Sequence, residues 1–271
     1  MGIALVVGAL STVRVSDDWK TRISWPSGSR AAVGLQGDIV TSGPAPDAPL
    51  QSASLTKLIT ALVVLAHDPI GPTDTGWIYP IEAADIARSH ALADQGLQTA
   101  PVVEGAPLSQ REALEMMLVG SAADYTEMLV TRTFGSVDAF LGATETWLAQ
   151  HDLTDTHVVD PVGMDAANTT TVSDILRIAR IAHEHPVVSE IAGTKVATAV
   201  DGSPIPNTNP LLGVDGVDGL KTGSLDGAYS LIVTAPVHGH DAFVLVWDAA
   251  SSAQREADAV RVLASLRAAL E

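Results

Sequence analysis

The stretch Gly216-Val-Asp-Gly-Leu-Lys-Thr-Gly223 marks the point at which the sequence changes character. From Leu220 onward, apolar residues alternate or run together in short segments separated by Gly, Pro and Asp, a pattern typical of β-strands. A final amphipathic stretch predicts a helix that closes the chain. The predicted strands cover 220–223, 228–234 and 241–247, and the predicted helix covers 251–270.

The N-terminal part of the chain also predicts strands. Residues 31–35 and 38–41 are two short runs joined by Gln36-Gly37, which is typical of a β-hairpin. Between the two strand-forming ends, apolar residues recur at helical spacing. The sequence therefore predicts an α/β (α+β) fold, in which an antiparallel sheet built from both chain ends is flanked by helices and an all-helical lobe of about residues 70–190 is inserted. The expected helices cover 54–68, 109–118, 122–133, 137–151 and 172–183.

The composition excludes several classes of function. The chain has 15 Lys and Arg against 32 Asp and Glu, a formal net charge of −17, whereas nucleic-acid binding and polybasic membrane attachment both need basic surfaces. It has no cysteine, which excludes disulfides, thiolate metal sites and a cysteine nucleophile. We expect no cofactor and no metal, because His183 and His185 have no third ligand at metal-binding spacing.

The first residues of the sequence leave two interpretations open. Residues 2–13 are apolar, but they are far shorter than the roughly 20 residues that cross a bilayer. No Lys or Arg precedes them, unlike the start of a signal peptide. They fit either a buried core segment or the remnant of an export or anchor segment, which would allow a membrane tether. We expect residues 1–29 to form an N-terminal arm.

The tetrapeptide Ser54-Leu-Thr-Lys57 offers a nucleophile and a base. Residues three apart on a helix share a face, so the Ser54 hydroxyl and the Lys57 amine can meet. A serine at a helix N-terminus also lies beside free backbone N–H groups, which favour a developing negative charge. The lysine can act as a base only where burial or a nearby positive charge keeps it partly neutral. Alone, the pattern also fits a serine that caps a helix.

Two further elements supply complementary groups. On a strand, Lys221 contributes positive charge and Thr222 a hydroxyl, which suit a carboxylate, while Gly223 lets a substrate backbone approach closely. The alternative is a strand-edge lysine beside a turn glycine. The chain has only four lysines, however, and Lys57 and Lys221 both fall in these short patterns. Ser121 lies at a break between two predicted helices, where its hydroxyl could enter a cleft between the lobes or cap the following helix.

These patterns occur in the order S-x-x-K, S-x-N, K-T-G that serine β-lactamases and penicillin-binding proteins share. From about residue 30 to the C-terminus, the sequence resembles the small D-alanyl-D-alanine carboxypeptidases of peptidoglycan metabolism. The resemblance implies a β-lactamase/transpeptidase-like fold and a serine D,D-peptidase catalytic domain over residues 30–271. It is carried by the K-T-G surroundings and by Ser52-Ala-Ser-Leu-Thr-Lys-Leu-Ile-Thr60, Met117-Leu-Val-Gly-Ser121, Thr154-Asp-Thr-His157, Asp160-Pro-Val-Gly-Met164 and Asn207-Thr-Asn-Pro-Leu-Leu-Gly213.

The resemblance also implies an activity and a set of roles. The enzyme would remove the terminal D-Ala of a peptidoglycan stem peptide through an acyl-enzyme, outside the cytoplasm in the cell envelope or secreted, and β-lactams would acylate the same serine as inhibitors. A lysine would take the serine proton, and a second serine would relay it to the leaving amine. The implied catalytic residues are Ser54, Lys57 and Ser121, the oxyanion hole is the backbone N–H of Ser54 and Ser224, and the residues that bind the substrate carboxylate are Lys221, Thr222 and Gly223.

One departure from the family pattern keeps alternatives open. The second motif reads Ser121-Ala122-Ala123, followed by Asp124, where the family usually has Ser-x-Asn. The Asn amide normally bonds the substrate and the motif lysine, and Ala123 can do neither. Another group would have to replace it, or the protein is a non-catalytic or weakly active relative that binds penicillin or peptidoglycan. A serine β-lactamase is disfavoured, because the glutamate pattern of class A enzymes does not occur between Ser121 and Lys221.

Overall fold

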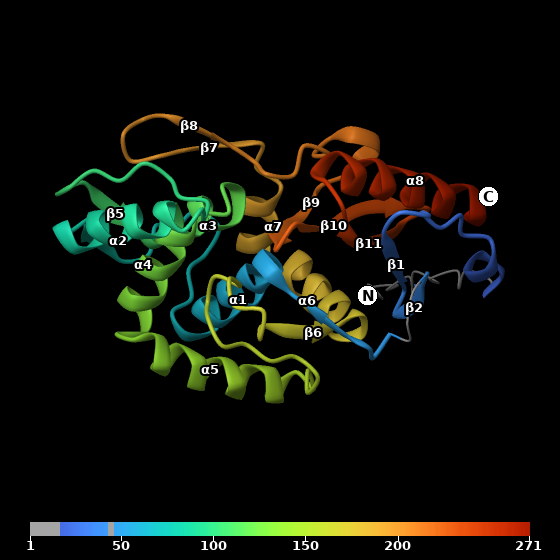
Figure 1. The fold of residues 1–271 in the computed structure, drawn as a ribbon, viewed down its shortest axis with the longest axis horizontal. Coiled ribbons are helices and arrows are strands. Elements are labelled where there is room, and N and C mark those ends of the chain that lie inside the picture. Colours follow the sequence, from blue (N-terminus) through green and yellow to red (C-terminus); the bar gives the residue numbers. More distant parts are fainter. Residues whose placement is uncertain (1–16, 43–45) are drawn as a thin grey trace, which may run out of the picture.

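The computed structural model describes residues 17–42 and 46–271, and its central feature is a five-stranded sheet with the order β2-β1-β11-β10-β9 (Figure 1). Every neighbouring pair of strands is antiparallel. Two strands come from the N-terminal part of the chain and three from the C-terminal part, which confirms the predicted sheet. The strands are β1 (Arg30–Leu35), β2 (Asp38–Thr41), β9 (Gly219–Leu225), β10 (Ala228–Val237) and β11 (His240–Ala249).

Alternate residues of the strands enter two separate hydrophobic cores. In β10, Leu231 and Val233 pack toward the C-terminal helix, whereas Ile232 packs toward the helical lobe. Both faces of the sheet are therefore buried, which explains why its central strands are almost continuously apolar. Helix α8 (Ser252–Leu270) covers one face and contacts β1, β10 and β11 (Figure 1). Trp19, in the short 3₁₀ helix η1 (Asp17–Thr21), is buried in the same core.

The other face of the sheet meets a group of helices arranged around α1 (Thr56–His67). Ten of the twelve residues of α1 are buried, and the helix contacts α3, α4, α5 and α6. The expected helices after residue 100 are confirmed with ends that agree within one or two residues, while α2 and α7 were not predicted. The bounds are α2 (Ala83–Asp94), α3 (Gln110–Val119), α4 (Ala123–Phe134), α5 (Val137–Gln150), α6 (Val172–Glu184) and α7 (Pro186–Ala192).

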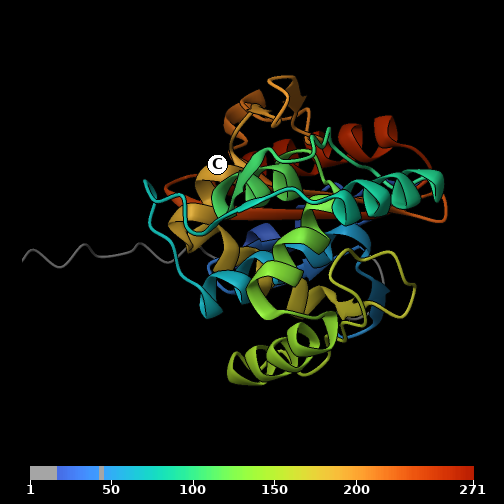
Figure 2. The same cartoon turned by 90° about the vertical axis from the view of Figure 1, so that its left-hand side faces the viewer.

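Three short strand pairs complete the architecture. They are β3 (Pro49–Gln51) with β6 (Thr169–Thr171), β4 (Ile78–Pro80) with β5 (Pro107–Ser109), and β7 (Val196–Thr198) with β8 (Pro204–Pro206). Figures 1 and 2 both place the β7–β8 hairpin on one side of the molecule and α5 on the opposite side. A 3₁₀ turn, η3 (Val214–Gly216), leads into β9.

None of the helices within residues 17–42 and 46–271 combines the length and the apolar character that crossing a membrane requires. The apolar stretch 2–13 lies outside the described residues, so its two interpretations are unchanged.

Candidate active site

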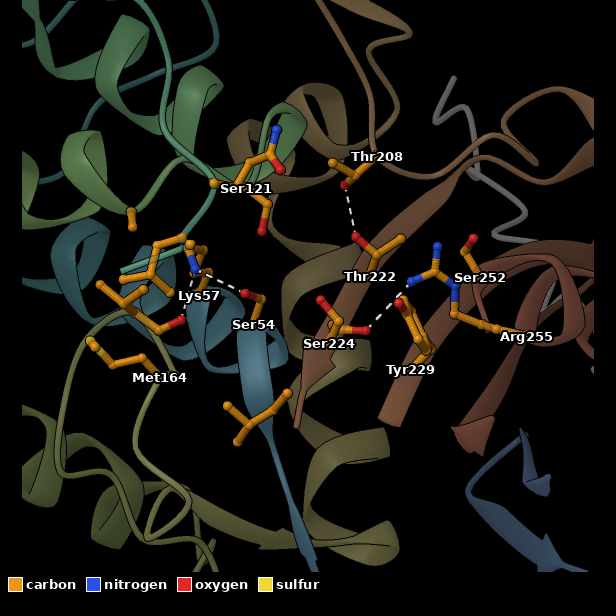
Figure 3. Close-up of a pocket in the computed structure, with 18 of the residues that line it drawn as sticks. Ser54, Lys57, Ser121, Met164, Thr208, Thr222, Ser224, Tyr229, Ser252 and Arg255 are labelled. Atoms are coloured by element: carbon orange, nitrogen blue, oxygen red, sulfur yellow. Dashed lines mark hydrogen bonds between the residues drawn. The ribbon is translucent and has the colours of Figure 1, made fainter. Parts of the chain in front are cut away.

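A cleft of about 450 Å³ lies where the β9 edge of the sheet faces the helical lobe (Figure 3). Its walls come from the start of α1, the loop after α2, the α3–α4 junction, the loop that precedes β6, strand β9 and the first turn of α8. Its volume is in the range of small-molecule binding sites. Most of the residues expected to carry chemistry line this cleft, namely Ser54, Lys57, Ser121, Thr222, Gly223 and Ser224.

Ser54 lies in the 3₁₀ helix η2 (Ala53–Leu55), which leads directly into α1. The expected α-helix therefore begins at Thr56, two residues later than predicted. Ser54 makes no capping bond, so the capping alternative is wrong. Its Oγ lies 3.0 Å from Lys57 Nζ, and the two side chains point toward each other in Figure 3. The three-residue spacing thus produces the predicted contact between hydroxyl and amine.

The backbone of η2 is held by a close contact with the loop that precedes β6. Ala53 has a left-handed φ of 46°, and Gly163 packs directly against it. A Cβ on Gly163 would lie 1.9 Å from the Ala53 carbonyl oxygen, and Gly163 itself has a φ of +80°. Only glycine fits this position, because a side chain there would clash and would also strain the backbone.

The environment of Lys57 favours its neutral form. The side chain is 1 % exposed, and burial lowers its pKa from 10.5 to about 7, although the charges of Asp160 and Asp124 oppose this shift. Besides Ser54, Lys57 Nζ lies 2.7 Å from the carbonyl oxygen of Val162. A buried amine that is partly neutral at neutral pH and in contact with a hydroxyl is the arrangement that a general base requires.

Asp160 organises the loop that carries Val162 and Gly163. Its Oδ1 accepts from the backbone N–H groups of Val162, Gly163 and Met164 at 2.8, 2.6 and 3.3 Å. Its Oδ2 accepts from the Asp165 N–H and from the Asn168 amide at 2.9 and 2.5 Å. The stretch 160–164 carries part of the family resemblance, but sequence reasoning assigned Asp160 no role.

The second predicted serine meets the second predicted lysine. Lys221 Nζ lies 3.0 Å from Ser121 Oγ and 3.1 Å from the Thr222 carbonyl oxygen. Ser121 has a left-handed φ of 57° at the α3–α4 junction, and the N-cap of α4 is Ala122, so Ser121 is not the cap of that helix. Lys221 is 1 % exposed, and burial lowers its pKa well below 10.5, with the positive charges of Lys57 and Arg255 lowering it further.

The residues that follow Lys221 bring the edge strand close to the nucleophile. Thr222 Oγ1 donates to Thr208 Oγ1 at 2.7 Å. A Cβ on Gly223 would lie 2.4 Å from Ser230 Oγ and 3.5 Å from the backbone N of Ser54. The absence of a side chain at Gly223 therefore leaves room for Ser230 Oγ, while β9 lies in ordinary contact with the backbone of Ser54. The neighbouring Ser224 is exposed at the wall of the cleft.

Arg255, in the first turn of α8, lines the cleft but was missed by sequence reasoning. Its side chain is largely buried, and Nη1 donates to the carbonyl oxygens of Gly223 and Ser230 at 3.4 Å each. Nη2 lies 3.2 Å from Glu256 Oε1. Its guanidinium lies over the Tyr229 ring, 5.9 Å from the centroid (Figure 3). Sequence alone gives no sign of this burial, because the spacing of Arg255 within an amphipathic helix is that of an ordinary surface arginine.

Ala123, which stands where the family usually has an Asn, has apolar surroundings in the structure. Ala123 is 1 % exposed and packs with Leu92 and Val162, with Leu97 beside them. The next residue, Asp124, is also buried, and burial raises the pKa of its carboxyl group. Asp124 Oδ2 accepts from Ser89 Oγ at 2.7 Å, and Oδ1 accepts from the Ala100 N–H at 3.3 Å. Asp124 therefore fixes neighbouring segments instead of facing the nucleophile.

Comparison with known families and proteins places this cleft in context. The sequence model of the family described as D-alanyl-D-alanine carboxypeptidase (Peptidase S11) matches residues 26–251. A D-alanyl-D-alanine endopeptidase of Pseudomonas aeruginosa is 26 % identical over 225 residues, 80 % of this chain and 69 % of the relative. An Escherichia coli D-alanyl-D-alanine endopeptidase is 25 % identical over 244 residues, 87 % of this chain and 76 % of the relative.

Solved structures share this fold over about nine-tenths of the chain. The Streptomyces K15 DD-transpeptidase superposes with a TM-score of 0.78 at 25 % identity and covers 91 % of this chain and 100 % of its own. The D-alanyl-D-alanine carboxypeptidase DacD of Francisella tularensis superposes with a TM-score of 0.75 at 22 % identity, over 90 % of this chain and 71 % of its own. This second likeness concerns the fold alone. Together they confirm the transpeptidase-like fold expected from the sequence.

Proposed function

Because the chain belongs to the D-alanyl-D-alanine carboxypeptidase family, we propose that it is a serine D,D-carboxypeptidase that removes the terminal D-Ala of peptidoglycan stem peptides. The observation that carries the proposal is the 3.0 Å contact between Ser54 Oγ and the buried amine of Lys57 at the base of the cleft. Since peptidoglycan is a polymer of the cell wall, the proposal places the working enzyme outside the cytoplasm.

In the proposed acylation step, neutral Lys57 takes the proton of the Ser54 hydroxyl. Ser54 Oγ forms a bond to the carbonyl carbon of the penultimate D-Ala, and the carbonyl oxygen becomes an oxyanion. The backbone N–H groups of Ser54 and Ser224 are the donors proposed for this charge, and they belong to η2 and β9, which contact each other. A preorganised donor of this kind typically lowers the barrier by about 3 kcal/mol.

Collapse of the tetrahedral species breaks the C–N bond and releases the terminal D-Ala. The leaving amine needs a proton, which passes from the Lys57 ammonium through the Ser121 hydroxyl, so that Lys57 returns to its neutral form. Lys221 supports this relay because it holds Ser121 Oγ at 3.0 Å. Water then attacks the acyl-enzyme carbonyl, and Ser54 leaves with a proton.

The terminal carboxylate of the substrate needs cationic and hydroxyl partners. Lys221 and Thr222 were expected to supply them, but the Lys221 amine is buried against Ser121. Arg255, on α8, lines the same cleft as Thr222 and Ser224 (Figure 3). We assign the carboxylate to Arg255 and the Thr222 hydroxyl, while the Lys221 amine holds Ser121 behind them. A permanently charged guanidinium suits a carboxylate better than a buried amine of lowered pKa.

The composition of the cleft also supports a peptidase over a β-lactamase. Among the described residues that line it, Glu256 is the only carboxylate, and it pairs with Arg255. A fast β-lactamase of class A uses a glutamate to activate the deacylating water, and no free carboxylate occupies such a position. β-Lactams should therefore acylate Ser54 and leave slowly, which makes them inhibitors.

Endopeptidase activity is the second candidate. The relatives of Pseudomonas aeruginosa and Escherichia coli are D-alanyl-D-alanine endopeptidases, which cleave a bond whose leaving group is larger than a single D-Ala. A third relative, from Salmonella typhimurium, is the D-alanyl-D-alanine carboxypeptidase DacD, 28 % identical over 220 residues. The family model that matches this chain is described as D-alanyl-D-alanine carboxypeptidase, and for this reason we favour the carboxypeptidase.

The test combines a covalent probe with two peptides. Intact-mass spectrometry after incubation with benzylpenicillin should show one adduct on the wild-type protein and none on Ser54→Ala. D-Ala should be released from a stem pentapeptide ending in D-Ala-D-Ala. The same peptide amidated at its C-terminus should not be cleaved to D-alaninamide, because the amide cannot pair with Arg255. Preferred cleavage of a cross-linked stem-peptide dimer would favour the endopeptidase. Failure to form the adduct or release D-Ala would favour a non-catalytic relative.

A further inference from the structure

Ala123 contributes only a methyl group to the wall of the cleft, but a residue with an amide side chain lines the cleft from the neighbouring loop. Gln98, in the loop between α2 and β5, also lines the cleft. Its backbone carbonyl oxygen accepts from the Ala123 N–H at 2.8 Å. The loop therefore runs directly alongside the first residue of α4, and the side chain of Gln98 starts from the backbone that neighbours Ala123.

The loop that carries Gln98 is fixed by consecutive residues of α4. Besides the bond from Ala123, the Asp124 carboxylate accepts from the Ala100 N–H at 3.3 Å, and the Tyr125 hydroxyl donates to the Pro101 carbonyl oxygen at 2.5 Å. These contacts fix Gln98 and the residues that follow it, and on its N-terminal side the Leu97 N–H donates to the Leu92 carbonyl oxygen at 3.1 Å. A side chain on a backbone held in this way has less conformational freedom to lose when it binds a ligand.

The amide of Gln98 is available for such a ligand. Gln98 is exposed, and within residues 17–42 and 46–271 its side chain makes no hydrogen bond to another protein group. Leu97, beside it, fills the apolar space next to Ala123. A glutamine amide offers a donor NH₂ and an acceptor C=O, which is the complement of a peptide group.

We propose that Gln98 supplies the amide that Ala123 lacks and hydrogen-bonds the substrate's peptide group next to the scissile bond. This inference rests on the proposed function and extends it: the recognition element of the second motif has moved from the helix to the adjoining loop. The stem peptide enters the cleft with peptide N–H and C=O groups that lose water, and each needs a partner. Gln98 is thus a substrate-binding residue for the acylation step.

The decisive variant is Gln98→Met, which keeps the length of the side chain and removes the amide. Two β-lactams serve as probes: benzylpenicillin carries a side-chain amide that stands in for the substrate peptide group, and 6-aminopenicillanic acid lacks it. We expect Gln98→Met to slow Ser54 acylation by benzylpenicillin about 10-fold, the effect of one lost hydrogen bond. Acylation by 6-aminopenicillanic acid should be unchanged, and so should the melting temperature, because Gln98 is exposed.

Gln95→Ala is the matched control. Gln95 belongs to the same loop, is exposed, does not line the cleft, and bonds the Ala91 carbonyl oxygen of α2. It should acylate with both probes at the wild-type rate. Equal slowing of both probes by Gln98→Met would overturn the inference, because it would reveal a general effect on the site. No slowing with either probe would also overturn it, while leaving the proposed function intact.

Two further outcomes separate this inference from the function on which it rests. Absence of any adduct on the wild-type protein would overturn the proposed function and the role of Gln98 with it. The variant Ala123→Asn should not acylate faster with benzylpenicillin than the wild type, because the amide position is already filled by Gln98. A faster reaction would show that the position is empty, and the inference would fail although the function stood.

Discussion

Two serine–lysine pairs in the cleft have the same length but are built differently. The contact from Ser54 to Lys57, 3.0 Å, joins residues three positions apart in η2 and the first turn of α1. The contact from Ser121 to Lys221, also 3.0 Å, joins residues 100 positions apart, one at the α3–α4 junction and the other in β9. The first pair is set by local backbone geometry. The second exists only while the helical lobe is packed against the sheet.

The electrostatic surroundings of the two lysines differ as well. Burial lowers the pKa of both, but nearby Asp160 and Asp124 limit the shift at Lys57, whose pKa is about 7. At Lys221 the nearby charges are the cations Lys57 and Arg255, which push its pKa further down. We therefore expect Lys57 to determine the proton chemistry and Lys221 to determine where Ser121 lies.

The largest effect should come from Lys57→Met. This variant removes the base from Ser54, and loss of a general base typically costs about 10²–10⁴ in rate. We expect acylation by a fluorescent penicillin to slow by about three orders of magnitude. Lys195→Met, at an exposed position, is the control and should react normally. If Lys57→Met kept a rate near that of the wild type, another group would be the base. The two lysines would then not differ in their role in proton transfer.

The pH dependence of acylation should follow Lys57. Since the neutral amine is required and its pKa is about 7, the rate should rise with pH and level off above this value, and at about pH 5 it should be roughly 100-fold below the plateau. The free energy of unfolding should also rise with pH. Between the folded pKa and the unfolded value of 10.5, Lys57 binds a proton in the unfolded chain but not in the folded one, so raising the pH favours the folded state.

Two measurements check this profile. Stopped-flow acylation by benzylpenicillin from about pH 5 upward gives the rate limb. Denaturant unfolding between about pH 7 and the unfolded pKa of 10.5 gives the stability slope, which Lys57→Met should flatten. A rate limb centred near the ordinary lysine pKa would show that the amine is solvated in solution, contrary to its 1 % exposure.

The variant Lys221→Met should have a smaller effect on the rate than Lys57→Met. Methionine has a similar volume and length, so the packing around the side chain is kept. Ser121 loses its partner, so we expect acylation to slow about 10-fold and the free energy of unfolding to fall by about 1–3 kcal/mol. A loss as large as that of Lys57→Met would mean that both lysines take part in proton transfer.

The local pair was predictable from sequence, whereas the long-range contacts were not. The spacing from Ser54 to Lys57 is enough to predict that they meet, because three residues of helical backbone bring side chains together. Ser121 and Lys221 were assigned to one site only through the family resemblance. Arg255 was missed because it lies on a helix, whereas the groups that it bonds, Gly223 and Ser230, lie on strands distant in the sequence. Gln98 was missed because it meets Ala123 through a backbone contact between two separate segments.

The same division applies to the fold. Strands β9, β10 and β11 were predicted because both faces of the sheet are buried, which leaves long apolar runs in the sequence. Helix α2 was missed because only Ser89 and Leu92 among its twelve residues are buried, so its sequence has hardly any apolar stripe. Its capping box pairs Glu82 with Asp85, not the Ser or Thr with Glu that marks a helix start most clearly.

The smallest expected effect tests how the local pair is supported. Gly163→Ala places a Cβ 1.9 Å from the Ala53 carbonyl oxygen at a φ of +80°, so η2 or the loop must shift. We expect the free energy of unfolding to fall by about 1–3 kcal/mol. Acylation should slow about fivefold, the factor that corresponds to roughly 1 kcal/mol of lost alignment between Ser54 and Lys57.

Gly202→Ala separates the contact from the backbone strain. Gly202 has a φ of +84°, but a Cβ there would have no atom within 4 Å, so this variant carries the left-handed strain without the clash. It should lose less stability than Gly163→Ala and acylate at the wild-type rate. If the two variants behaved alike in both assays, the contact between Gly163 and Ala53 would not be what holds Ser54 against Lys57. The position of Ser54 relative to Lys57 would then depend only on the backbone of η2 and α1. The Ser54–Lys57 pair would need no long-range contact at all, unlike the Ser121–Lys221 pair.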